Sequence, residues 1–156
     1  MWEMGECGPA CASAARCFLH VDPARHRAGV WVAVDDGTTL REGPVIAQYL
    51  ADRQPDAGLA PAWGTLARYR LMEWLNFLTM EIHKGFIPLL YAVPAGKYVE
   101  QARRKLDSRF AWIDRQLAGR TFVTGDALTI ADAYLFALTG WARRRGCARF
   151  TTRIST

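Results

Sequence analysis

Apolar and polar residues follow a short alternating pattern over residues 30–40, and this pattern predicts a β-hairpin. Val32-Ala33-Val34 and Thr39-Leu40 flank Asp36-Gly37, a pair that favours a tight turn between two strands. Residues 1–29 are rich in small and polar residues and predict no strand, with at most a short helix over 10–18. The first regular structure is therefore expected at Val30.

Helical spacing follows the hairpin directly. Pro44 suits a first helical turn, where its missing N–H has no partner to lose. Val45, Ile46, Tyr49 and Leu50 then fall on one side of a helix that is expected to end at residue 52. Residues 53–62, with Pro55 and Gly58, read as a linker.

Residues 63–142 are expected to be wholly helical. The first long helix should end at Pro88, which cannot continue a helix that precedes it, and the second should stop at Gly119. Each has an apolar stripe at a spacing of three and four residues. The stripes comprise Leu71, Leu75, Leu78, Ile82 and Phe86 in the first helix, and Val99, Ala102, Leu106, Phe110, Ile113 and Leu117 in the second.

A third helix begins with a compact start signal. Thr129 and Asp132 form a capping box, and Leu128 and Ala133 occupy the positions of a hydrophobic staple. Loss of such a cap typically costs about 1 kcal/mol. Because the residues from 133 to 138 are apolar nearly all round, the helix is expected to be buried on every side.

Composition changes this picture little. A hydrophobic content of 51% with 22% charged residues is ordinary for a globular protein, and 156 residues can bury one core. The net charge of +5 comes from residues 143–156, an irregular basic tail with five arginines and no acid. The body is neutral, which disfavours nucleic acid as a partner. No apolar run approaches the ~20 residues of a membrane span, and the missing signal pattern at the N-terminus favours the cytoplasm.

The cysteines suggest no metal site. In the cytoplasm all four are expected to be reduced. Cys7, Cys11, Cys17 and His20 lie close together in the sequence, but their spacing matches no familiar zinc arrangement. We therefore expect the protein to bind no metal.

Glu42 carries the most specific candidate chemistry. It stands at the start of the helix predicted from Pro44, beside backbone N–H groups that attract a carboxylate. Its own side chain can hold an ammonium group. Together these features suit the zwitterionic end of an amino acid or peptide, although an acid at this position can also simply favour the helix dipole.

The order of these parts resembles the glutathione transferases, most closely their bacterial beta class, over about residues 30–142. The resemblance implies a mainly α protein: a partial thioredoxin-like α/β domain over residues 1–52, with a β-hairpin and a helix, followed by a truncated all-helical domain over 63–142. The matching runs are Asp35–Asp52, Leu59-Ala60-Pro61, Arg68–His83 with Trp74-Leu75-Asn76-Phe77, and Phe122–Trp141 with Thr129-Ile130-Ala131-Asp132.

The resemblance also implies roles for individual residues. Glu42 matches the acid that holds the γ-glutamyl ammonium of glutathione, and Gly43 faces its carboxylate. Val30 matches the residue whose backbone pairs with the cysteinyl part. His83 and Lys84 match a pair that lines the active-site cleft, although on sequence alone they read as solvated helix positions.

Both ends of the chain depart from the family pattern. Only 29 residues precede Val30, where the family places a strand–helix–strand unit; Gly8-Pro9-Ala10-Cys11 faintly echoes its cysteine-bearing turn, so Cys11 is the candidate catalytic residue. Trp31 replaces a cis-proline, and since a cis bond before Trp costs about 3 kcal/mol we expect a trans bond. The pattern stops again after Trp141. We expect shifted reading frames at both ends, which translation of the flanking DNA would test.

The function implied is conjugation of the glutathione thiol to electrophilic small molecules, by a homodimer. The sequence leaves two alternatives open, a non-catalytic interaction module on the same fold and a non-functional gene remnant. It does not identify the electrophile. Because the hairpin lacks the strand it would pack on, we expect low stability and exposed apolar surface that promotes oligomers.

Overall fold

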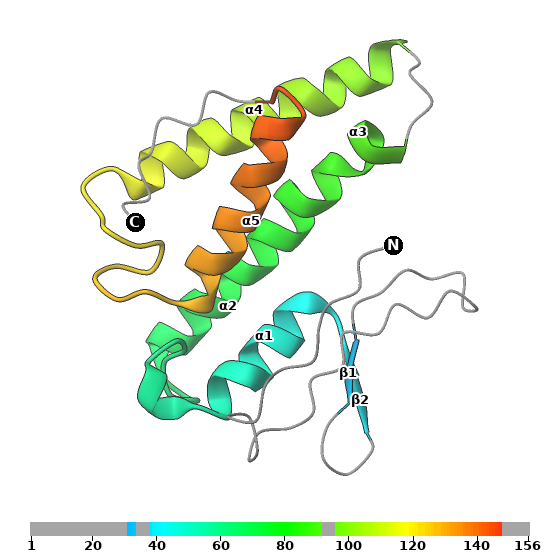
Figure 1. Cartoon of the computed structure of the whole chain (residues 1–156). Helices are drawn as coiled ribbons and strands as arrows, with labels where there is room; N and C mark the ends of the chain where they lie inside the picture. Colours follow the sequence, from blue (N-terminus) through cyan, green and yellow to red (C-terminus); the bar gives the residue numbers. More distant parts are fainter. Residues whose placement is uncertain (1–30, 34–37, 92–95, 148–156) are drawn as a thin grey trace. The chain divides into compact units, whose positions relative to one another are not determined.

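The computed structural model describes residues 31–33, 38–91 and 96–147 (Figure 1). These residues fall into two compact units that meet within one helix, at Ile46 and Ala47, whereas the sequence places the domain boundary at residue 52. Each unit is described by itself.

The first unit holds the predicted hairpin. Strands β1 (Trp31–Ala33) and β2 (Thr39–Arg41) pair antiparallel, with Val32 opposite Leu40. The turn that joins them, including Asp36-Gly37, lies outside the described residues. Helix α1 (Gly43–Asp52) follows at once with Pro44 in its first turn, so both the hairpin and the helix predicted from the sequence are confirmed.

The first long helix of the second unit is composed of several types of turn. After a short 3₁₀ turn, η2 (Pro55–Ala57), the chain forms α2 (Leu66–Phe77), a π-helical turn η3 (Leu78–His83), a 3₁₀ turn η4 (Lys84–Phe86) and α3 (Ile87–Tyr91). The predicted stop at Pro88 is wrong. Pro88 lies in the first turn of α3, where proline is tolerated.

A threonine explains the wide turn. The Thr79 hydroxyl donates to the carbonyl of Leu75 at 2.8 Å, the group that the Thr79 N–H would bond in a regular α-helix. The Lys84 N–H then donates to the Thr79 carbonyl, five residues back, which is the hydrogen bond of a π-helix. Gly85 follows, and a Cβ built on it would lie 2.8 Å from Leu106 Cδ2, so this turn packs close to a neighbouring helix.

That neighbour is α4 (Gly96–Leu117), which packs with α2 and α5 (Ile130–Arg144) around one hydrophobic core (Figure 1). Gly119, with φ of 76°, follows the end of α4 as predicted. Both predicted stripes enter the core, with Val99 and Ala102 only partly buried. Within the described residues, no helix is at once long and apolar enough to cross a membrane.

The sequence predicted that helix α5 is buried on every side, and this prediction is wrong. Leu135 and Leu138 are buried, but Ala133 and Ala137 are exposed and Phe136 is 57% exposed. The apolar composition of the helix therefore exceeds what its core face requires. Leu128 is 50% exposed as well, so the predicted staple with Ala133 lies at the surface.

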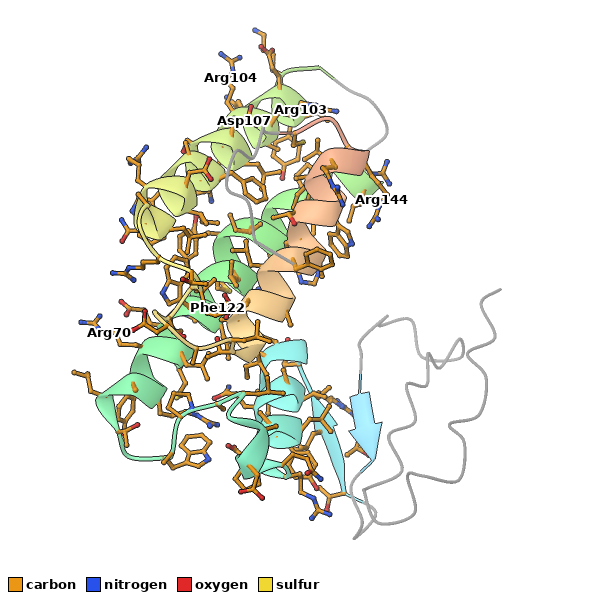
Figure 2. The ribbon with its side chains drawn as sticks, turned by 60° about the vertical axis from the view of Figure 1, so that its left-hand side comes forward. Arg70, Arg103, Arg104, Asp107, Phe122 and Arg144 are labelled. Carbon is orange, nitrogen blue, oxygen red and sulfur yellow. The ribbon has the colours of Figure 1, made fainter. Side chains whose placement is uncertain are left out.

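Helix α5 extends two residues into the predicted tail, to Arg144. The Cys147 N–H donates to the carbonyl of Ala142 at 3.0 Å, and Gly146 adopts φ of 62°, which together form a Schellman motif. Arg103 of α4 donates to the carbonyl of Arg145 at 2.7 Å (Figure 2). These bonds keep Arg143 and Arg144 helical and leave Cys147 buried.

The predicted capping box is present at the start of α5, and Asp132 makes most of its bonds. Asp132 Oδ2 accepts from the backbone N–H of Thr129 at 2.8 Å and from its hydroxyl at 2.9 Å. Oδ1 accepts from the N–H of Val123 at 2.7 Å. One buried carboxylate thus joins the helix to the preceding loop.

Replacing Asp132 with Ala should lower the free energy of unfolding by about 2 kcal/mol, because two backbone N–H groups lose their acceptor. Chemical denaturation measures the loss. Asp126→Ala, at an exposed position in the same loop, is the matched control and should change stability little. Equal midpoints for the two variants would contradict the role given to Asp132.

Candidate functional site

Glu42 has an unusual backbone conformation at the entrance to α1. Its φ is 69°, the left-handed region, and it is the single residue other than glycine with positive φ in the described part of the chain. This conformation costs a residue with a Cβ about 1–2 kcal/mol. It turns the Glu42 carbonyl towards the helix, where it accepts from the N–H groups of Val45 and Ile46, each at 3.0 Å. Strain of this kind often occurs at binding sites.

The start of α1 has few donors left for a ligand. Pro44 has no N–H, and those of Val45 and Ile46 already donate to Glu42. Gly43 is exposed, and a Cβ built on it would meet nothing within 4 Å. An anion at this helix end would therefore depend on the Gly43 N–H, beside the exposed carboxylate of Glu42.

His83 is not the solvated side chain that its sequence context suggests. It ends the wide turn η3 and is partly buried, with Nδ1 2.6 Å from the hydroxyl oxygen of Tyr134 on α5. Trp141 meets the imidazole edge to face, with ring centroids 4.9 Å apart. Burial lowers the pKa of His83 and so favours the neutral imidazole. Lys84, the next residue, is exposed.

Several predicted residues remain untested. Glu42 and Gly43 belong to the first unit and His83 and Lys84 to the second, so their shared site stays a prediction. Cys11, Val30 and the peptide bond before Trp31 lie outside the described residues. The same holds for Cys7, Cys17 and His20, which with Cys11 were considered as metal ligands. Among residues 31–33, 38–91 and 96–147, no three histidine, cysteine or acidic side chains are grouped to hold a metal ion.

An ion pair at the C-terminal end of α1 was not predicted from the sequence. The guanidinium of Arg68, which is fully buried, donates to both carboxylate oxygens of Asp52, at 2.7 and 2.8 Å. The ring centroid of Trp63 lies 3.9 Å from Arg68 Cζ, and the Trp63 indole N–H donates to Asp52 Oδ2 at 2.9 Å. The hydrogen bonds from Arg68 are the main reason that the pKa of Asp52 is lowered. No local pattern signals a pair 16 residues apart.

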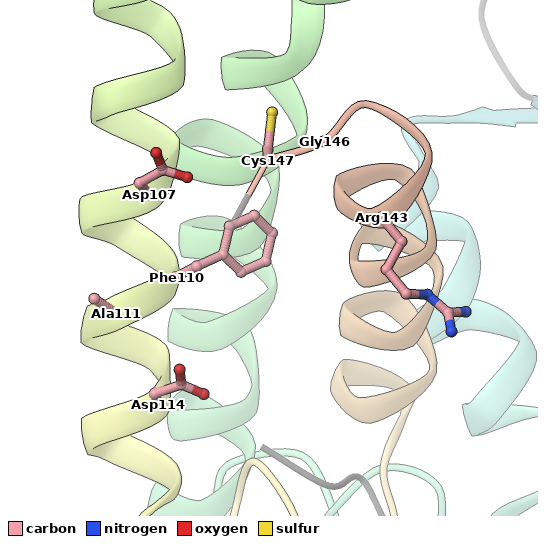
Figure 3. Close-up of a pocket in the computed structure, with 7 residues that line it drawn as sticks. All are labelled: Asp107, Phe110, Ala111, Asp114, Arg143, Gly146 and Cys147. Atoms are coloured by element: carbon pink, nitrogen blue, oxygen red, sulfur yellow. The ribbon is translucent and has the colours of Figure 1, made fainter. Parts of the chain in front are cut away.

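A pocket of about 490 Å³ lies between α4 and the end of α5 (Figure 3). Its buried thiol, Cys147, has a raised pKa, chiefly because burial disfavours the thiolate. The thiol is therefore a poor nucleophile. Of the assigned residues that the structure describes, namely Glu42, Gly43, His83 and Lys84, none lines this pocket. The lining consists of Asp107, Phe110, Ala111, Asp114, Arg143, Gly146 and Cys147.

Comparison with known proteins relates the chain to a family. The family model "Glutathione S-transferase, C-terminal domain" matches residues 96–153. The glutathione S-transferase GstA of Escherichia coli O157:H7 is 40% identical over 109 residues. The chain is a relative of the glutathione S-transferases. The resemblance predicted from its motifs is thereby confirmed, as is the mainly helical fold.

Solved structures agree with this relationship. A sphingomonad glutathione S-transferase in complex with glutathione is 39% identical, with a TM-score of 0.73 over 76% of this chain and 59% of that one. The beta class enzyme of Sphingomonas chungbukensis is 36% identical, with a TM-score of 0.74 over 82% of this chain and 63% of that one. The match to GstA covers 70% of this chain but only 54% of that relative, so the chain spans about half the length of GstA.

Proposed function

We propose that this chain binds glutathione and promotes the attack of its thiolate on small electrophiles, with detoxification in the cytoplasm as the wider role. The observation that carries the proposal is the similarity to glutathione S-transferases, one of them solved with glutathione bound. Because the chain spans about half the length of GstA, its own activity is part of the proposal.

Glu42 and Gly43 would hold the charged end of the tripeptide. The exposed carboxylate of Glu42 can accept from the γ-glutamyl ammonium, and the Gly43 N–H can donate to the neighbouring carboxylate. The open space beside Gly43 leaves room for that group. Val30, by resemblance, would pair its backbone with the cysteinyl part.

The chemical step is nucleophilic. The sulfur of the deprotonated thiol forms a bond to the electrophilic carbon, and a leaving group departs with its electron pair. Donors near the sulfur lower the pKa of the thiol and raise the share of thiolate. Cys11, His83 and Lys84 are the residues that we assign to this part of the site by resemblance.

The basic test of the proposal uses the purified full chain. We expect retention on immobilised glutathione, a saturable titration with glutathione by calorimetry, and conjugation of glutathione to a chromogenic aryl halide above the uncatalysed rate. No binding in the calorimeter at millimolar glutathione would reject the proposal.

We also propose that the protein is a homodimer that uses the exposed side of α2 and η3. Leu66 and Tyr69, three residues apart on α2, are 71% and 59% exposed, and Met80 is exposed farther along. Large apolar side chains exposed along one helix favour association. A second copy of the chain is the occupant that we propose for this face.

Leu66→Glu should convert the dimer to a monomer, because it places a charge in the apolar face. Leu66 is the first residue of α2, where an acid favours the helix, so the change should not unfold the chain. Sedimentation velocity measures the outcome. Tyr98→Glu, at an exposed position on α4, is the control and should remain dimeric. A monomeric wild-type protein would refute the homodimer.

A further inference from the structure

The hydrogen bond between His83 and Tyr134 is the best-defined polar contact around the residues assigned to the glutathione site. Its atoms, Nδ1 and the phenol oxygen, are 2.6 Å apart and come from residues 51 positions apart in the chain. Both side chains are partly buried. A bond this short between two elements fixes the orientation of the imidazole ring.

Two further features hold the ring. Trp141, also on α5, meets the imidazole edge to face at an interplanar angle of 88° and in turn packs on Phe86 of the buried core. The wide turn η3 places His83 opposite these residues of α5. The imidazole is thus held by one hydrogen bond and one aromatic contact from the same helix.

The acidities of the two groups decide which one donates. A phenol, with a usual pKa near 10, is a far stronger acid than the N–H of a neutral imidazole. The stable arrangement is therefore an O–H of Tyr134 that donates to an unprotonated Nδ1. In a neutral imidazole the proton then resides on Nε2, because one ring nitrogen donates when the other accepts.

We propose that Tyr134 is a positioning residue of the glutathione site, which acts by holding His83 in the tautomer that carries its proton on Nε2, where it can donate to the sulfur of bound glutathione. This inference rests on the proposed function and adds to it a residue that the family resemblance did not assign. Without the phenol the ring would exchange between its two tautomers, and only one of them offers the donor.

The test removes one oxygen atom. Tyr134→Phe keeps the ring and its packing, so ¹⁵N spectra of the His83 imidazole at neutral pH should shift from the Nε2–H tautomer in the wild type to a mixture in the variant. The affinity for glutathione should stay the same, while kcat should fall about tenfold. Removal of the group that orients a metal-bound histidine typically costs about 10- to 100-fold, and we expect the lower end of that range. Tyr98→Phe, at an exposed tyrosine, is the matched control.

A double-mutant cycle separates positioning from packing. In a His83→Asn background, Tyr134→Phe should cause no further loss of kcat if the tyrosine acts through His83. An equal loss in both backgrounds, or a wild-type spectrum of the Nδ1–H tautomer, would overturn the inference. A wild-type chain that fails to bind glutathione would refute the proposed function instead, and the ¹⁵N spectra would still decide the role of Tyr134.

Discussion

Glu42→Gln is expected to raise the dissociation constant for glutathione about 10- to 100-fold. The change removes the negative charge that we assign to the γ-glutamyl ammonium and keeps the size of the side chain. A hydrogen bond between charged groups contributes about 1.5–3 kcal/mol, and each 1.4 kcal/mol is a factor of ten in affinity. Calorimetric titration of the full chain measures the effect.

Two further variants sharpen this test. Glu42→Gly should lose the same affinity yet gain about 1 kcal/mol of stability, because glycine adopts a φ of 69° without strain. Glu100→Gln removes an acid that pairs with Arg104 on the exposed side of α4 and should leave affinity unchanged. Equal affinities of Glu42→Gln and the wild type would remove Glu42 from the site.

Asp52→Ala should lower the free energy of unfolding by about 3 kcal/mol. It leaves the Arg68 guanidinium buried without its carboxylate, and a buried charge that loses its partner typically costs 3–5 kcal/mol. We expect the lower end because the Asp52 side chain is 32% exposed and water can reach it. Urea denaturation followed by tryptophan fluorescence measures the change.

The charge itself can be tested by a second substitution and by pH. Asp52→Ala with Arg68→Met should be more stable than Asp52→Ala alone, since the uncompensated charge is gone. Because the pKa of Asp52 is lowered in the folded protein, its contribution is complete well above the ordinary carboxyl pKa and is lost as the pH falls through the lowered folded pKa. Asp56→Asn, an exposed neighbour, is the control; if it destabilises as much as Asp52→Ala, the pair has no special role.

Local signals predicted much of the fold. Asp36-Gly37 indicated the hairpin, Thr129 and Asp132 indicated the start of α5, and Gly119 marked the end of α4, because each effect acts within a few residues. Helix type was not predictable in the same way. An apolar stripe at a spacing of three and four residues suits an α-helix and a π turn equally, so the pattern gave no sign of η3.

Contacts between distant residues escaped the sequence analysis. Neither Arg68 nor Tyr134 was among the candidate site residues predicted from the sequence. Their partners, Asp52 and His83, are 16 and 51 residues away. The exposed Phe136 shows the converse, because apolar side chains are common on surfaces and composition alone does not bury them. Glu42 was placed at a helix start by sequence, but nothing in its residue type indicated a positive φ.

The wide turn at Leu78–His83 has a consequence for how this protein tolerates change. A π turn holds one residue more than the α-helical turn it replaces, so shortening the segment by a single residue would restore regular winding. A deletion outside the turn has no extra residue to remove and would instead rotate everything downstream by about 100°, the step of one residue in an α-helix. The alignment of His83 with Tyr134 is thus a matter of residue count, and a deletion within the turn should be tolerated better than one in the α-helical segments beside it.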